Sequence, residues 1–166
     1  MSAIAFIPID LESTAELCIC FRRDAMAESF AGGAERFDLA SGDNHQQYLD
    51  WLQQRLQEFP EGCVHMLEGN SIVGQIEMQL TGQQSLAYLN MLYLVPAARG
   101  RGLGNQLHDY IIQIFQQVGV VKAQLSVSPT NQRALAFYKK HHWQDLGPRP
   151  EDPELHLMDL TVGDWA

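Results

Sequence analysis

A short segment of the chain combines alternating glycines with two arginines, from Arg99 to Gly104 (RGRGLG). It follows a strand-like apolar run, Leu86 to Val95, and precedes a run with helical apolar spacing, Leu103 to Val118. The N–H groups of a helix's first turn have no acceptor inside the helix, and the helix dipole favours negative charge there. Glycines allow close approach of the backbone, and arginines fork onto phosphate oxygens. The segment therefore predicts a site for a phosphorylated ligand, most simply a pyrophosphate.

Two common nucleotide motifs do not account for this turn. A P-loop requires a lysine and then Ser or Thr after its last glycine, and neither follows Gly104. The dinucleotide fingerprint G-x-G-x-x-G also fails, because its sixth position is Asn105 counted from Gly100 and Leu107 counted from Gly102. A glycine-rich turn that only reverses the chain is the alternative to a phosphate site.

A second segment, Ser128 to Lys140 (SPTNQRALAFYKK), places Asn131 at a strand-to-helix junction, seven residues before Tyr138. This spacing puts both side chains on one side of a helix. Together the two segments resemble the GNAT superfamily of acyl-CoA-dependent N-acyltransferases. Arg99 to Gly104 is similar to the R/Q-x-x-G-x-G/A pyrophosphate motif, and the second segment contains N-x-x-A-x-x-x-Y. The resemblance is best over about residues 72–143.

The resemblance implies how acetyl-CoA would bind. Backbone N–H groups of the glycine turn would hold the pyrophosphate, and the preceding strand would pair with the pantetheine arm. The arm needs a slot, so the strand at Leu94 must splay from the strand Lys122 to Val127, around Leu125. The implied binding residues are Leu92, Leu94, Arg99, Gly100, Arg101, Gly102, Leu103, Gly104, Asn105, Asn131 and Tyr138. Arg133, Lys139 and Lys140 are either 3′-phosphate ligands or solvated surface cations.

The implied chemistry is direct attack of a neutral amine on the thioester. Tyr138, with a pKa near ~10, would protonate the leaving thiolate, and a backbone N–H near Leu94 would stabilise the oxyanion. The strand positions expected to share the catalytic face contain no carboxylate: Tyr88, Asn90, Leu92 and Leu94. Glu77 on the neighbouring strand is the nearest acid, or Asn90 or Tyr88 orients a water. The alternatives are a half-exposed strand carboxylate for Glu77 and a core aromatic for Tyr138.

Composition limits the function classes. The 166 residues are 46% apolar and 19% charged, with a net charge of −9, which predicts one globular domain over residues 1–166. Residues 1–90 hold four arginines against thirteen acids, whereas residues 91–166 are balanced. This argues against nucleic acid and suggests a cationic acceptor, or simply an acidic surface. No run of about 18 apolar residues predicts a membrane span. Asp10 comes too early for a signal peptide, so a cytoplasmic protein is expected.

Patterning predicts six strands and four helices. The strands are expected at Ile4–Ile9, Cys63–Leu67, Ile72–Leu80, Leu86–Val95, Lys122–Val127 and Leu155–Leu160. The helices are expected at about residues 13–30, 44–59, 103–118 and 131–141, with a loop at Phe37–Asp43. This order predicts an α/β (α+β) fold: a mixed, mostly antiparallel sheet of six to seven strands with helices on both faces, as in GNAT proteins.

The resemblance implies an N-acetyltransferase that uses acetyl-CoA and a primary amine. The first two helices and the loop Ala31 to Asn44 are expected to bind the acceptor. No cysteine is placed for a covalent route, and neither cysteine nor histidine spacing predicts a metal site: Cys18, Cys20 and Cys63 read as reduced thiols. A non-catalytic acyl-CoA sensor is the alternative. A monomer or a homodimer is expected, the latter through an apolar C-terminal stretch that ends in Trp165.

Overall fold

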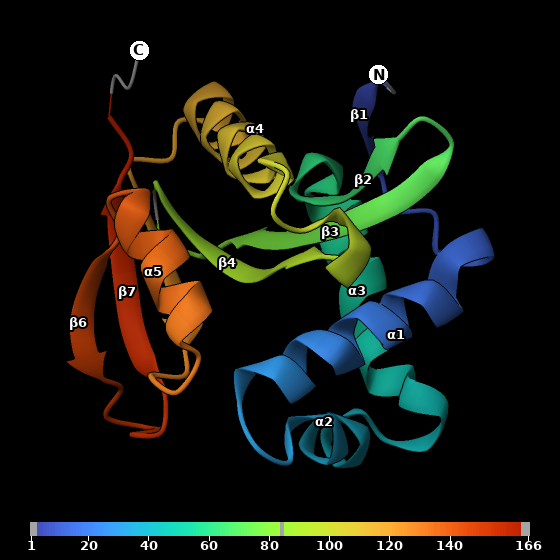
Figure 1. Cartoon of the computed structure of the whole chain (residues 1–166), viewed down its shortest axis with the longest axis horizontal. Coiled ribbons are helices and arrows are strands. Elements are labelled where there is room, and N and C mark those ends of the chain that lie inside the picture. Colours follow the sequence, from blue (N-terminus) through green and yellow to red (C-terminus); the bar gives the residue numbers. More distant parts are fainter. Residues whose placement is uncertain (1–2, 84, 164–166) are drawn as a thin grey trace.

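The computed structural model describes residues 3–83 and 85–163, which contain a seven-stranded sheet (Figure 1). The strands are β1 (Ile4–Pro8), β2 (Cys63–Glu68), β3 (Ser71–Leu80), β4 (Leu86–Leu94), β5 (Lys122–Val127), β6 (Gln144–Pro148) and β7 (His156–Thr161). Their order in the sheet is β1-β2-β3-β4-β5-β7-β6. The pair β4–β5 is parallel and the other described neighbours are antiparallel, so the predicted mixed, mostly antiparallel sheet is confirmed. Trp165 lies outside the described residues.

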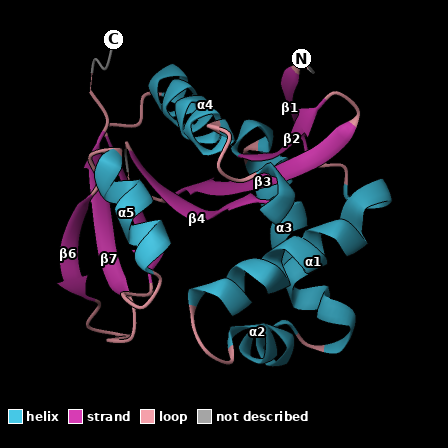
Figure 2. Cartoon of the chain, in the orientation of Figure 1, coloured by secondary structure: helices cyan, strands magenta, loops and turns pink. Residues whose placement is uncertain are grey.

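Helices cover both faces of the sheet (Figure 2). They are α1 (Leu11–Ser29), α2 (Gly33–Ser41), α3 (Gln46–Glu58), α4 (Leu103–Val118) and α5 (Gln132–Lys140). Leu107 and Ile111 of α4 are fully buried in the main core cluster, on which α5 also packs. On the other face, Phe21 of α1 packs on Met91 and Tyr93 of β4. None of the helices within residues 3–83 and 85–163 has the length and apolar character needed to cross a membrane.

Helix α2 occupies part of the segment that was predicted to be a loop, so that prediction was wrong. Its buried residues Ala34, Phe37 and Ser41 recur at spacings of three and four, which is a helical pattern. The helix lies close against α1, because a Cβ on Gly33 would stand 1.9 Å from the carbonyl oxygen of Met26. Only glycine therefore allows this approach of α2 to α1.

Strand β6 was also missed by the sequence analysis. Four of its five residues are exposed, including Leu146 at 52%, so it shows no alternation of apolar and polar positions. It pairs with β7 at the edge of the sheet, through Gln144, Asp145 and Pro148. An edge strand of this kind is held by its backbone partner and leaves little hydrophobic signal.

Strands β4 and β5 separate in the middle of the sheet. They pair from Leu86 with Lys122 to Leu89 with Leu125, and no pairing continues beyond that point. The register with β3 shifts at the same place, since Glu77 pairs with Met91 but Met78 pairs with Leu89. Asn90 is thus the extra residue of a β-bulge, which bends a strand and breaks its pairing. The predicted splay is confirmed, and it begins directly after Leu89 and Leu125.

The bulge also changes which residues of β4 share a face. Leu92 and Leu94 pack on the main core cluster, on the side of α4. Tyr88 pairs with Gln79 of β3, and Met91 pairs with Glu77 of β3. Gln79 and Glu77 are two residues apart and so share a face, which places Tyr88 and Met91 together on the face opposite Leu92. The prediction that Tyr88, Asn90, Leu92 and Leu94 face one side was wrong. A regular period of two does not survive an inserted residue.

Candidate active site

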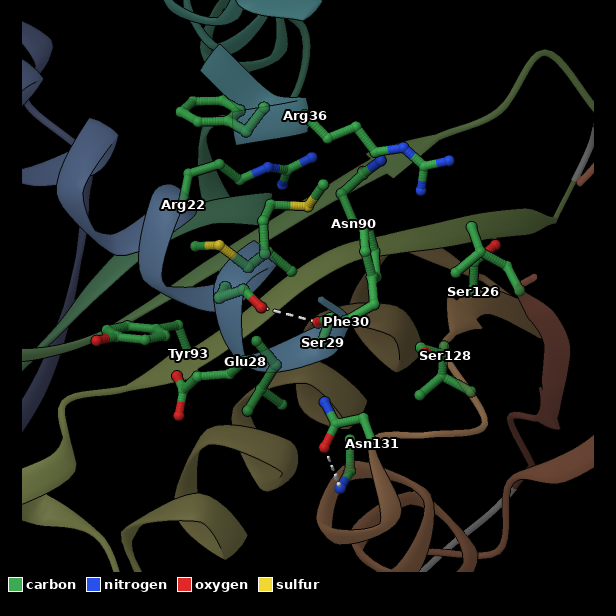
Figure 3. A pocket seen from close by; sticks show the side chains of 18 of the residues that line it. Arg22, Glu28, Ser29, Phe30, Arg36, Asn90, Tyr93, Ser126, Ser128 and Asn131 are labelled. Carbon is green, nitrogen blue, oxygen red and sulfur yellow. Dashed lines mark hydrogen bonds between the residues drawn. The ribbon is translucent and has the colours of Figure 1, made fainter. Parts of the chain in front are cut away.

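A cavity of about 970 Å³ runs between helices α1–α3 and the split in the sheet, and reaches the N-termini of α4 and α5 (Figure 3). Eight of the residues predicted for the site line it: Asn90, Leu92, Leu94, Arg99, Gly100, Gly104, Asn131 and Tyr138. Five predicted residues do not: Glu77, Arg101, Gly102, Leu103 and Asn105. The cavity therefore joins the two sequence motifs, which lie on different elements, at the place where β4 and β5 part.

The N-terminus of α4 has no side-chain cap. Gly102 is the N-cap residue, with φ of 81°, and Gly100 has φ of 78°. A Cβ at either position would meet nothing within 4 Å, so backbone conformation and not space requires glycine there. By contrast, Asp10 caps α1 and Asn131 caps α5 with their side chains. The uncapped first turn of α4 leaves N–H groups and a positive dipole end for an anion.

Both arginines of the glycine turn are engaged in ion pairs. Arg99 donates from Nε to the carbonyl oxygen of Leu94 (2.9 Å) and from both Nη atoms to Glu28 (2.6 and 2.8 Å). Arg133 of α5 donates to the same Glu28 carboxylate at 3.1 Å. Burial acts to raise the pKa of Glu28, but the two arginines hold it below its ordinary value. Arg101 pairs with Glu68 of β2, outside the cavity.

Tyr138 lies half-buried on α5, edge-on to Trp143 with ring centroids 5.8 Å apart. No residue in the described ranges accepts or donates a hydrogen bond at its hydroxyl. Burial raises the pKa of Tyr138 above that of a free tyrosine. The group therefore stays protonated at neutral pH and is free to donate. Asn131 uses its Oδ1 to cap Ala134 N at 3.2 Å, which leaves its amide nitrogen for a ligand.

Glu77 is completely buried beneath the cavity. Its carboxylate accepts from Arg22 Nη1 (2.6 Å), from the Tyr48 hydroxyl (2.5 Å) and from Gln75 Nε2 (2.7 Å). Burial and the Glu77 charge both raise the pKa of Tyr48. Both oxygens of Glu77 are thus occupied by partners from α1, α3 and β3. The carboxylate reaches the cavity only through Arg22 and Tyr48, which line it.

Two polar positions lie at the bulge and beside it. Asn90 Oδ1 is buried and has no hydrogen-bond partner in the described part of the chain. The Tyr88 hydroxyl lies 2.5 Å from Ser126 Oγ, across the split. Arg149 donates to the Tyr88 hydroxyl at 3.2 Å and also contacts Ser126. An unpartnered buried acceptor requires a donor N–H or a water.

Sequence reasoning missed most side chains on the helical wall of the cavity. They come from α1, α3 and the segment between them, which was expected to bind the acceptor: Arg22, Met26, Phe30, Arg36, Tyr48 and Trp51. No local motif marks them, because they meet only when the helices pack. Cys18 and Cys63 are buried and Cys20 is exposed, and none lines the cavity. Burial raises the pKa of the Cys18 and Cys63 thiols to about 12.

Histidines do not form a site with other ligands in the described residues. Trp143 Nε1 donates to His108 Nε2 at 2.9 Å, and His141 stacks on His108 with centroids 4.1 Å apart. Within residues 3–83 and 85–163, no group of three or more His, Cys, Asp or Glu side chains could hold a metal ion. These histidines pack α4 against α5.

Comparison with known proteins shows what the chain is similar to. The acetyltransferase (GNAT) family matches residues 25–143. The PaiA N-acetyltransferase from Thermoplasma acidophilum, solved in complex with coenzyme A, is similar with a TM-score of 0.78, 19% identity, and coverage of 96% of this chain and 99% of that one. An N-acetyltransferase from Staphylococcus aureus Mu50 has a TM-score of 0.72 and 15% identity over 98% and 100% of the two chains. A ribosomal-protein-alanine N-acetyltransferase from Brucella melitensis has a TM-score of 0.71 and 16% identity over 95% and 99%.

Proposed function

Because the chain belongs to the acetyltransferase (GNAT) family, we propose that it transfers an acetyl group from acetyl-CoA to the primary amine of an acceptor. One observation carries the proposal: the split between β4 and β5 opens onto the uncapped N-terminus of α4, within one cavity. The split exposes a strand edge, and the helix terminus favours an anion. Acetyl-CoA combines both matching groups, because its pantetheine arm can pair with a strand edge and its pyrophosphate is an anion.

The residues present fit acetyl-CoA as a substrate. The first-turn N–H groups after Gly102 would bind the pyrophosphate. The unpaired edge of β4, residues 90–94, would pair with the amides of the pantetheine arm. The amide nitrogen of Asn131 would reach the same arm, since its oxygen is already used as the α5 cap. Arg133 lines the cavity and would exchange Glu28 for a phosphate group.

The chemistry follows from these positions. The neutral amine attacks the thioester carbonyl, so that a C–N bond forms and the carbon–sulfur bond breaks. A backbone N–H of β4 near Leu94 stabilises the oxyanion. The Tyr138 hydroxyl gives its proton to the departing thiolate. The amine loses its proton to water in the cavity, because both oxygens of Glu77 already accept hydrogen bonds.

A protein that only senses acyl-CoA would need no space beyond the thioester. Here the cavity continues past the bulge to α1–α3, where Arg22, Trp51 and Arg36 line it. Tyr138, whose hydroxyl has no hydrogen-bond partner among the described residues, also lines this cavity. Both observations favour a catalytic role, with a separate acceptor bound opposite Tyr138.

Replacing Tyr138 by Phe tests the proposal. Release of free CoA thiol from acetyl-CoA is followed with a panel of amines, and acetyl-CoA binding is measured separately by calorimetry. We expect turnover to fall about a hundredfold while acetyl-CoA still binds, because only the proton donor is lost. Tyr110→Phe is the matched control, since its hydroxyl donates to the carbonyl oxygen of Glu61 outside the cavity. Equal turnover in Tyr138→Phe and Tyr110→Phe would exclude Tyr138 as the acid.

A further inference from the structure

The end of the cavity farther from the α4 N-terminus combines two arginines with an unpartnered acceptor. Arg22 comes from α1, Arg36 from α2 and Asn90 from the bulge of β4. Figure 3 shows these three side chains together, apart from Asn131 at the other end. If the proposed acetyl transfer is correct, this end holds the acceptor, so its chemistry indicates the class of amine.

Arg22 is fixed in place with one edge of its guanidinium occupied. Nη1 donates to the buried Glu77 carboxylate at 2.6 Å, and the group lies 5.7 Å from the Tyr48 ring centroid and 5.8 Å from that of Trp51. Its side chain is 21% exposed. Among the described residues, no other acceptor engages this guanidinium. A held arginine with a free edge on a cavity is suited to bind an anionic ligand.

Arg36 approaches the same space from α2. Its guanidinium stacks over the Phe30 ring, 4.9 Å from the centroid. Its ion pair with Glu154 is a single 3.2 Å contact, with the side chains 48% and 75% exposed. An ion pair this exposed contributes little and is easily exchanged. A ligand carboxylate would therefore displace Glu154 at little cost.

The bulge supplies a hydrogen-bond acceptor, where the two arginines supply donors. Asn90 Oδ1 is buried without a donor, and an N–H group of a ligand would satisfy it. Asp152, in the loop before β7, also lines the cavity and makes no ion pair with a described residue. These two acceptors suit an amine that arrives as an ammonium group and then loses a proton.

We propose that the acceptor is an amino-acid-like zwitterion, whose carboxylate binds Arg22 and Arg36 while its amine binds Asn90 Oδ1 opposite the thioester. This differs from the cationic acceptor that the charge of residues 1–90 suggested. Among the described residues, the lining contains Arg22, Arg36, Arg99 and Arg133 with the carboxylates of Glu28 and Asp152, while Glu77 and Glu154 pair with Arg22 and Arg36 from outside it. A polyamine would place a second ammonium group beside guanidinium groups, which costs binding energy.

Matched substrates test the inference. Each of a set of free amino acids is compared with its own carboxamide and with spermidine, in the CoA-release assay with acetyl-CoA saturating. Rates are compared per neutral amine, because a carboxamide lowers the pKa of its neighbouring amine. We expect kcat/KM to favour the carboxylate over the carboxamide by about tenfold or more, the usual effect of a charge-assisted hydrogen bond.

Substitution of Arg36 tests whether this arginine causes the preference for a carboxylate. Arg36→Gln should raise KM for the amino acid about tenfold, with kcat and the KM for the carboxamide unchanged. Arg23→Gln is the control, because Arg23 lies on α1 beside Arg22 but pairs with Asp38 outside the cavity. Arg36→Gln removes an exposed ion pair and the stack of Arg36 on Phe30, both at the surface of α2, so its fold is expected to survive.

Each outcome decides between the two proposals. Equal or faster acetylation of carboxamides or spermidine, or an equal change for both substrates in Arg36→Gln, would overturn the zwitterion and leave acetyl transfer standing. Acetyl-CoA binding without turnover of any amine would instead refute acetyl transfer, and the acceptor inference with it.

Discussion

Glu77 is a buried ion-pair partner in this structure, and replacing it separates that role from catalysis. Glu77→Ala leaves the Arg22 guanidinium, with a side chain only 21% exposed, without its carboxylate. Removing one partner of a buried pair costs about 3–5 kcal/mol, and the partial exposure of Arg22 favours the lower value. For a domain of this size, 1 kcal/mol corresponds to about 2–4 °C in Tm. We expect Glu77→Ala to lower Tm by roughly 6–12 °C.

Calorimetric melting and urea unfolding measure this loss. Glu77→Gln keeps the volume and an acceptor for the Tyr48 hydroxyl, so it should destabilise less than Glu77→Ala. Glu58→Gln is the control, since the Glu58 side chain is itself 55% exposed where it pairs with Arg55 one helical turn away, and the change should alter stability by less than about 0.5 kcal/mol. Turnover of Glu77→Gln, measured well below its melting temperature, should keep the pH profile of the parent chain.

The opposite pattern would refute the reasoning. If Glu77→Gln melts like the parent but loses turnover a hundredfold or more, the carboxylate acts in the chemistry. Loss of one limb of the pH–rate profile in the same variant would identify it as the base.

Three further changes follow from the packing, the glycine turn and a buried histidine. Leu107→Ala, at a fully buried site, should cost about 2–5 kcal/mol in urea unfolding. Gly102→Ala should cost about 1 kcal/mol and weaken acetyl-CoA binding, because φ is 81° there, whereas Gly82→Ala, with open space and no positive φ, should be near neutral. Burial, together with the charge of His141, lowers the pKa of His108 to about 3. The unfolded chain takes up that proton near pH ~6.5, so stability should fall as the pH drops from ~6.5 towards ~3, by about 2 kcal/mol at pH ~5. Urea midpoints check this, and His108→Gln should lose that part of the pH dependence, while His65 and His141, whose pKa values burial also lowers, keep the remainder.

The sequence was most informative where local chemistry determines local structure. The glycines of residues 99–104 and the apolar period of residues 103–118 together predicted a strand, a turn and a helix N-terminus, and the structure has all three. Asn131 was correctly placed at a strand-to-helix junction, where it caps α5. The need for a slot predicted the splay of β4 from β5.

The sequence was less informative where tertiary packing decides. The bulge at Asn90 follows from the register between β3 and β4, and it moved Tyr88 to the face opposite Leu92. Arg22 and Arg36 lie fourteen positions apart on two helices, and only the packing of those helices brings both to one cavity. The net charge of residues 1–90 says little about this cavity, because the acidic residues of that half mostly lie outside its lining.

The most direct test of the account is a titration of the isotope-labelled protein with acetyl-CoA, followed through backbone amide resonances, with ATP as the control ligand. The account predicts saturable binding with the largest shifts at residues 100–105 and 90–94, at the α4 N-terminus and the free edge of β4. ATP should produce no comparable shifts along β4. Absence of binding, or shifts confined to other parts of the chain such as α2, would contradict the assignment of this cavity to acetyl-CoA.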